Sequence, residues 1–331
     1  MADSMLNVYL DQKDWIALLK ADAGKPERQA HADALTLLRA AVEARSVSLP
    51  LSHVHYQETS HRKPFAKRVE LAKLMAELSR FHSLAPFYKL SKQEMRYFIA
   101  THFEAPIATP DPPTAFGRGG DHAFGYPTID DGLEALKVKF RPFASGVDET
   151  VDSMRDVLEL GLLTGHPEHD VGPAPADRLR KLEADEAERR EKRRRVRLQG
   201  GGTKGDLSQR TKYATAYYEQ QDTILEALAE VGVKKMPGND VAITWFVENV
   251  PTMYCDYELS RLKEEATDRA WTENDLRDIW ALSAALVYAD VVVTEKSWAR
   301  LANRSLAARY GTLVLDDVGQ LVDVLLAAAA A

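Results

Sequence analysis

The sequence contains a single cysteine, Cys255, among 331 residues. One cysteine forms neither an internal disulfide nor a cysteine zinc cage, so neither can hold the chain together. Apolar runs of the roughly 20 residues that a membrane span needs are also missing. The first residues, MADSMLNVYLDQKDW, carry acids where a signal peptide has a basic and then an apolar segment. These absences predict a cytoplasmic protein with no membrane partner.

The chain also lacks a glycine-rich phosphate loop and a recognisable serine triad. Its formal net charge of -7 weighs against a protein that coats nucleic acid by charge alone. The same charge suits an enzyme that grips a phosphodiester through a bound metal held by carboxylates. With 45% hydrophobic and 28% charged residues, the composition is that of an ordinary globular protein.

Short apolar runs that favour strands occur near both ends of the sequence. They comprise residues 6–10, 47–51, 291–293 and 312–315. Amphipathic segments between them predict helices over about 13–21, 27–44, 65–81 and 297–310, and another helix begins after Thr272. Strands that alternate with helices predict an α/β fold with a parallel sheet flanked by helices. The run Val291–Val293 suits a strand that is covered on both faces.

The middle of the sequence has a different character. Segments rich in proline and glycine follow residue 105 and residue 164, and both read as loops. We therefore expect residues 1–104 and 221–331 to form one discontinuous domain, with 105–220 as a mainly helical, loop-rich insertion. The arginine-rich stretch 178–197 contains many interspersed acids, which favours a salt-bridged helix over a nucleic-acid contact.

Four acids stand where a parallel sheet would gather them. Asp11 follows the first strand, Glu295 comes one residue after the strand Val291–Val293, and Glu58 and Asp278 lie on predicted helices. Ligands of open α/β sheets bind beyond the carboxyl ends of the strands. Four carboxylates at that edge would repel each other unless cations bind them. Their hard oxygen atoms suit Mg²⁺ or Mn²⁺. An acid in this position is also a common turn former or helix cap, so each one alone is weak evidence.

Taken in order, these segments resemble the PIN-like nuclease superfamily. VYLD (8–11) is similar to the first strand with its aspartate, and SHVHYQE (52–58) resembles the segment with the second acid. DIWALSAA (278–285) resembles the helix with the third acid, and VVVTEKSW (291–298) resembles the strand with the fourth. The resemblance covers roughly 5–90 and 235–325 and implies a PIN-like fold with Asp11, Glu58, Asp278 and Glu295 as catalytic metal ligands.

The sequence departs from the family pattern at two motifs. Gln12 and Lys13 follow Asp11, where the family often has Thr or Ser and Asn. Many members carry the fourth acid one position later, where this chain has Lys296. The long middle segment argues against a minimal toxin ribonuclease.

The resemblance implies a metal-dependent nuclease, with RNA favoured over DNA as substrate. Alternatives are a catalytically inactive PIN-like scaffold or sensing module, and another metal phosphoesterase with an acidic site. The sequence DQKD after the first strand lacks the pattern of aspartyl-phosphate phosphatases. Lys13, Lys296 and Arg300 are candidate phosphate contacts, with plain surface charge as the equal alternative. Asp275 is either a fifth ligand or a helix-start residue, and a homo-oligomer or protein partner stays open.

Overall fold

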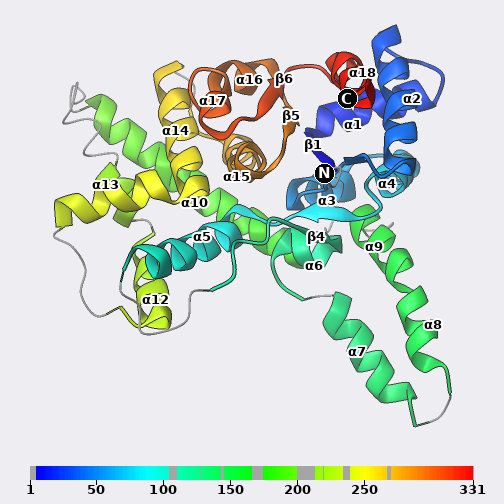
Figure 1. Ribbon diagram of the computed structural model, residues 1–331, viewed down its shortest axis with the longest axis horizontal. Coiled ribbons are helices and arrows are strands. Elements are labelled where there is room, and N and C mark those ends of the chain that lie inside the picture. Colours follow the sequence, from blue (N-terminus) through cyan, green and yellow to red (C-terminus); the bar gives the residue numbers. More distant parts are fainter. Residues whose placement is uncertain are drawn as a thin grey trace. The chain divides into compact units, whose positions relative to one another are not determined.

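The computed structural model describes residues 5–103, 110–127, 129–142, 145–165, 174–199, 213–218, 220–233, 239–266 and 270–330 (Figure 1). The chain divides into two compact units. Unit 1 comprises Met1–Pro86, Phe116–Leu179 and Tyr288–Ala331, and unit 2 comprises Phe87–Ala115 and Arg180–Val287. The fold is α/β and mostly helical.

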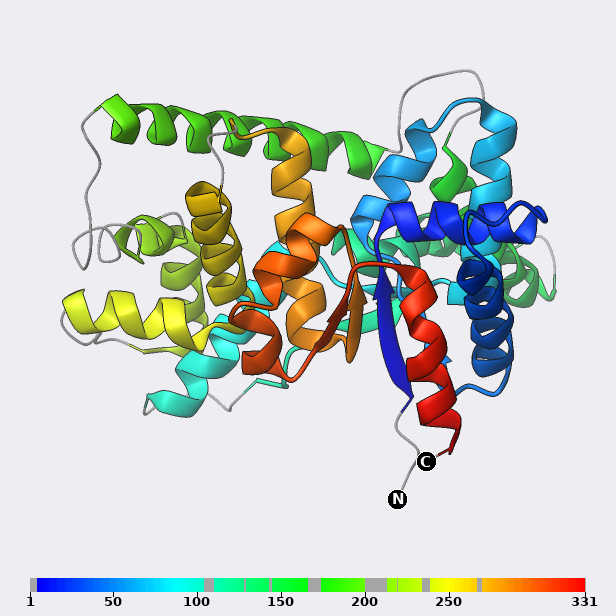
Figure 2. The same cartoon turned by 90° about the horizontal axis from the view of Figure 1, so that it is seen from above.

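Unit 1 contains a small parallel sheet of four strands. The strands are β1 (Leu6–Leu10), β2 (Val47–Ser48), β5 (Val291–Val293) and β6 (Leu313–Leu315), in the order β2-β1-β5-β6. All three strand pairs are parallel, which confirms the predicted parallel sheet. In Figure 2 the blue strand β1 and the orange strand β5 belong to opposite ends of the sequence, and the two are paired. The three valines of β5 are buried because both faces of the strand are covered.

Helices make up most of unit 1. Those that follow the first two strands are α1 (Gln12–Asp22), α2 (Gln29–Glu43), α3 (His53–His61) and α4 (Phe65–Ser79). Those near the C-terminus are α16 (Lys296–Ala302), α17 (Leu306–Tyr310), the 3-10 helix η1 (Val318–Gln320) and α18 (Leu321–Ala330).

The middle of the sequence also contributes to unit 1. An antiparallel pair of strands joins β3 (His82–Leu84) to β4 (Phe116–Arg118). Four helices follow, namely α6 (Gly119–Phe124), α7 (Ile129–Phe140), α8 (Val147–Ser153) and α9 (Arg155–Thr164). The loop expected after residue 105 is wrong at β4 and α6, because three glycines between 117 and 120 conceal both elements in the sequence.

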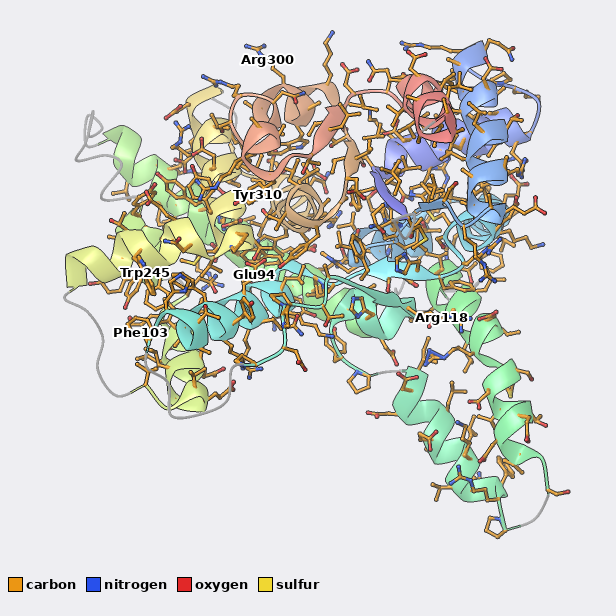
Figure 3. All side chains as sticks on the ribbon, viewed as in Figure 1. Glu94, Phe103, Arg118, Trp245, Arg300 and Tyr310 are labelled. Carbon is orange, nitrogen blue, oxygen red and sulfur yellow. The ribbon has the colours of Figure 1, made fainter. Side chains whose placement is uncertain are left out.

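Unit 2 is built from helices around an aromatic core. Its helices are α5 (Phe87–His102), α12 (Gln221–Val231), α13 (Asn239–Asn249), α14 (Pro251–Ala266) and, up to Val287, α15 (Glu273–Tyr288). From Arg180 onward, α10 (Ala174–Gln199) also belongs to unit 2. Buried Glu94 on α5 accepts hydrogen bonds from the Thr252 hydroxyl (2.7 Å) and backbone N–H (2.9 Å). The rings of Phe103 and Trp245, labelled in Figure 3, pack edge to face with centroids 5.1 Å apart.

The division into units cuts the chain at 86, 115, 179 and 287, whereas the sequence suggested boundaries at 104 and 220. The expected insertion 105–220 stays a prediction, and its residues 105–109, 128, 143–144, 166–173, 200–212 and 219 lie outside the described residues. Within the described part of the chain, no helix combines the length and apolar character that crossing a membrane requires.

The paired strands of unit 1 allow a direct test of the sheet. Val292 on β5 is fully buried, whereas Leu313 on β6 is 44% exposed. We expect Val292→Asp to lower the free energy of unfolding by about 3 to 5 kcal/mol, because an unpaired charge would be buried. Leu313→Asp should cost less than about 1 kcal/mol. Urea unfolding of both variants measures this; equal costs would contradict the described sheet.

Candidate functional site

Three neighbouring strands of unit 1 end in register, and each is followed by acids. We call the residues after β1, β5 and β6 the carboxyl edge. The backbone N–H of Asp11 donates to the carbonyl of Val293 (2.9 Å), and that of Thr294 donates to Leu315 (3.0 Å). Asp11, Thr294 and Asp316 therefore stand level with one another. This register brings the acid after β1 next to the acid after β5.

Asp11 and Glu295 both stand where a strand of the sheet passes into a helix. Each is the N-cap of the helix that follows, and neither side chain makes a capping hydrogen bond. The Thr294 hydroxyl instead donates to Asp11 Oδ2 (3.3 Å). Burial raises the pKa of Asp11, and the nearby Glu295 carboxylate raises it further. The two carboxylates therefore lie close enough to repel, and neither is used to cap its helix.

A third acid at this edge was not singled out from the sequence. Asp14 lies in the first turn of α1 and is buried. Its Oδ1 accepts the backbone N–H of Val318 (3.1 Å). Burial raises the pKa of Asp14 to about 7; Asp11 adds to this rise, and Lys13 partly offsets it. Its three-residue spacing from Asp11, which is one helical turn, was the available signal.

The two residues after β6 contact other protein groups, Asp317 through its carboxylate and Asp316 through its backbone. Asp317 accepts the N–H of Gly319 (2.9 Å) and pairs with Arg28 (3.0 Å) and His31 (3.2 Å). The backbone carbonyl of Asp316 accepts a hydrogen bond from Lys13 Nζ (2.7 Å). These contacts fasten the end of β6 to α1 and α2. Lys13, a candidate phosphate contact, is thus directed at the protein itself.

Glu58 lies on α3, which is fixed to the end of β1. His55 Nε2 donates to the carbonyl of Leu10 (2.7 Å), and its Nδ1 accepts the backbone N–H of Ser52 (2.8 Å). Burial lowers the pKa of His55 to about 4, so the ring is neutral and this network assigns its proton to Nε2. Gln12 donates to the Thr59 hydroxyl (3.1 Å). Glu58, next to Thr59 and half-buried, therefore stands on a helix that begins at the carboxyl edge.

Asp278 belongs to unit 2. It lies half-buried on α15, the helix that precedes β5 in the chain. Asp275 on the same helix is buried and accepts hydrogen bonds from the Thr272 hydroxyl (2.6 Å) and N–H (2.9 Å). Lys263 lies 3.4 Å from its carboxylate. Asp275 therefore stabilises the start of its helix, the simpler of the two roles considered for it.

The structure sorts the predicted site residues into three groups. It brings Asp11 and Glu295 together, and it anchors the helix of Glu58 at the end of the same strand. Asp278 is not among the residues that unit 1 assembles. Lys296 and Arg300 are exposed on α16, directly after Glu295.

The donor set at the carboxyl edge suits a hard cation. Mg²⁺ is commonly bound by one or two carboxylates, with waters and substrate phosphate completing its six ligands. Asp11 and Glu295 provide two such carboxylates, and their mutual repulsion would be relieved by a cation. Across the described residues, no group of three or more His, Cys, Asp or Glu side chains has the geometry of a metal site.

The arginine-rich helix α10 forms ion pairs, as its sequence predicted. In the part that belongs to unit 2, Glu191 binds Arg194 (2.9 Å) and Arg195 (2.8 Å). Arg190 is buried and pairs with Asp256 (3.1 Å). These three arginines are thus paired within the protein.

No protein-family model, no curated protein and no solved structure matches this chain. The candidate site therefore rests on the residues and contacts described above.

The raised pKa of Asp14 predicts how stability varies with pH. The folded state holds the Asp14 proton up to about pH 7, whereas the unfolded chain releases it near pH 4. Stability from this group is therefore complete below about pH 4 and is lost as the pH rises to 7. We expect Asp14→Asn to raise the melting temperature at pH 8, by an amount that shrinks toward pH 4.

Asp33→Asn is the matched control, because Asp33 is exposed on α2. Differential scanning calorimetry from pH 4 to 8 measures both variants. A difference between wild type and Asp14→Asn that does not change with pH would contradict the buried, protonated carboxyl.

Proposed function

We propose that this protein is a metal-dependent nuclease that hydrolyses phosphodiester bonds at the carboxyl edge, with RNA favoured over DNA. The observation that carries the proposal is the pair Asp11 and Glu295. Both acids follow adjacent parallel strands and stand at helix N-caps, yet neither side chain caps its helix. Burial and the nearby Glu295 carboxylate raise the pKa of Asp11, and the backbone N–H of Gln12, Lys13 and the Thr294 hydroxyl only partly offset the rise. A carboxylate perturbed by burial and by a like charge is typical of functional sites.

In the proposed site, Asp11 and Glu295 hold Mg²⁺ or Mn²⁺, and Glu58 is a further ligand that the PIN-like resemblance implies. The resemblance also implies Asp278, which belongs to unit 2, and its role as a ligand stays a prediction. When bound, such an ion supplies an activated water and stabilises charge on the phosphate. Thr294, through its hydrogen bond, orients the Asp11 carboxylate. His55 holds α3 at the end of β1, which fixes the helix that presents Glu58. Lys296 and Arg300 are the candidate phosphate contacts nearest to Glu295 in the chain.

A catalytically inactive module of the same fold is the second candidate. Lys296 favours this candidate, because many PIN-like proteins have an acid at that position. Lys13 also favours it, because its ammonium donates to the backbone carbonyl of Asp316. An inactive module would keep the sheet and its acids and bind a partner without cleaving it. Activity measurements on acid variants separate the two candidates.

The first test of the proposal is cleavage. We expect Asp11→Asn and Glu295→Gln each to reduce the rate of single-stranded RNA cleavage in Mg²⁺ or Mn²⁺ by at least about 100-fold, because each removes a metal-binding charge. Glu58→Gln and Asp278→Asn should behave alike if they are ligands. Asp33→Asn serves as the exposed control. Cleavage that persists in both Asp11→Asn and Glu295→Gln would place the chemistry elsewhere, and no cleavage by wild type would favour the inactive module.

The second test is the response of stability to metal. A cation that binds only the folded acids raises the free energy of unfolding, by about 2.7 kcal/mol when its concentration is 100 times its dissociation constant. We expect Mg²⁺ or Mn²⁺ to raise the melting temperature of wild type and of Asp33→Asn, but not of Asp11→Asn. In EDTA, Asp11→Asn should melt above wild type, because it removes a carboxylate whose pKa burial and Glu295 raise. Equal shifts in all three proteins would exclude a metal at Asp11.

A further inference from the structure

The segment that leads away from the carboxyl edge is basic and contains no acid. From Lys296 to Leu315 the sequence has four cations and neither Asp nor Glu. This stands out in a chain whose formal net charge is -7. Lys296 directly follows Glu295, so the basic segment starts at the proposed site.

Helix α16 separates its apolar and basic residues onto opposite faces. Trp298, Ala299, Leu301 and Ala302 are buried. Lys296, Arg300 and Arg304 are exposed. At 100° per residue, Lys296 and Arg300 lie about 40° apart around the helix. Arg304 lies in the turn that follows the helix and is also exposed. We call Lys296, Arg300 and Arg304 the basic strip; Figure 3 shows Arg300 pointing outward from the protein.

The cations of the basic strip form no ion pair with the described residues, in contrast to many elsewhere in unit 1. Other exposed cations of that unit form ion pairs with acids. These pairs are Arg28–Asp317, Arg39–Glu77, Lys67–Glu70, Arg118–Asp156 and Arg141–Asp148. In the described ranges, no carboxylate lies within ion-pair distance of the strip. Three unneutralised cations on one short segment therefore make a local positive surface.

We propose that the basic strip binds the backbone of a single-stranded nucleic acid and leads it to the carboxyl edge. The substrate class, RNA first, rests on the proposed function. Lys296 and Arg300 lie one helical turn apart, about 6 Å along the axis, and the strip is a single row. A single row suits one strand of phosphates, whereas a duplex presents two. A strand on the strip reaches Asp11 and Glu295 at its Lys296 end.

Binding in EDTA tests the strip independently of cleavage. The probe is a fluorescein-labelled single-stranded oligonucleotide of mixed sequence, as RNA and as DNA, followed by anisotropy across a series of salt concentrations. The test variant combines Lys296→Gln, Arg300→Gln and Arg304→Gln. Each phosphate contact contributes about 0.7 to the slope of log affinity against log salt for single strands, so the slope should fall by about 2. Affinity at 100 mM salt should drop on the order of tenfold or more.

The matched control removes the same total charge from isolated positions. It combines Lys25→Gln, Lys73→Gln and Lys139→Gln, three exposed lysines that lie after α1, on α4 and on α7. We expect this control to bind like wild type. An equal loss of affinity in both triple variants would mean that only net charge matters and would overturn the proposed strip. Failure of the wild type to bind either oligonucleotide would also overturn it.

Cleavage of the same oligonucleotides separates this inference from the proposed function. If the strip variant loses binding and the wild type does not cleave, the result supports the proposed strip and contradicts the proposed nuclease. If Asp11→Asn abolishes cleavage and the strip variant binds like wild type, the result supports the proposed nuclease and overturns the proposed strip.

Discussion

The parallel pairing of β1 with β5 brings together residues that lie more than 280 positions apart, and the candidate site depends on it. Leu10 stands level with Val293, which places Asp11 beside Thr294. A slip of one residue would turn every side chain of a short strand to its other face. The buried valines of β5 oppose such a slip, because it would replace their well-packed neighbours. Apolar packing in the strands thus fixes where the acids after them can lie.

The acids of unit 1 differ in what their carboxylates bind. Asp317 binds a backbone N–H, the Arg28 guanidinium and the His31 ring, and Asp14 accepts the N–H of Val318. Both therefore hold η1 against α1 and α2. Asp11 and Glu295 sit at helix N-caps, where a short side chain such as that of Asp commonly caps the helix, yet neither makes that bond. Burial and the nearby Glu295 carboxylate raise the pKa of Asp11, and the proposed cation would relieve that repulsion.

The sequence indicated the parallel sheet and its four strands, because short apolar runs followed by acids or turns mark buried parallel strands. It also placed Asp11 and Glu295 at strand ends, and their proximity followed from the topology. It did not indicate β4 or α6, since glycines that serve a short strand and helix look like loop residues. Nor did it indicate Asp14, whose burial depends on Val318 at the far end of the chain. The three-residue spacing from Asp11 marks the side of the helix on which Asp14 lies, but a contact with a distant segment leaves no local pattern.

The net charge of -7 is compatible with the proposed binding of a polyanion, because salt screens the interaction between exposed charges that are far apart. At physiological ionic strength the Debye length is about 8 Å, so exposed charges farther apart than that are largely screened. Lys296 and Arg300 are closer than this to each other by helix geometry, whereas many acids of unit 1 are already paired with cations of their own. A phosphate near α16 is therefore attracted by the basic strip more strongly than it is repelled by the more distant acids of the protein. At the carboxyl edge the balance reverses, and there a phosphate can approach Asp11 and Glu295 only when a cation lies between them. The proposed strip and the proposed metal thus both reduce the repulsion between phosphates and an acidic protein, at two successive positions along one nucleic-acid strand.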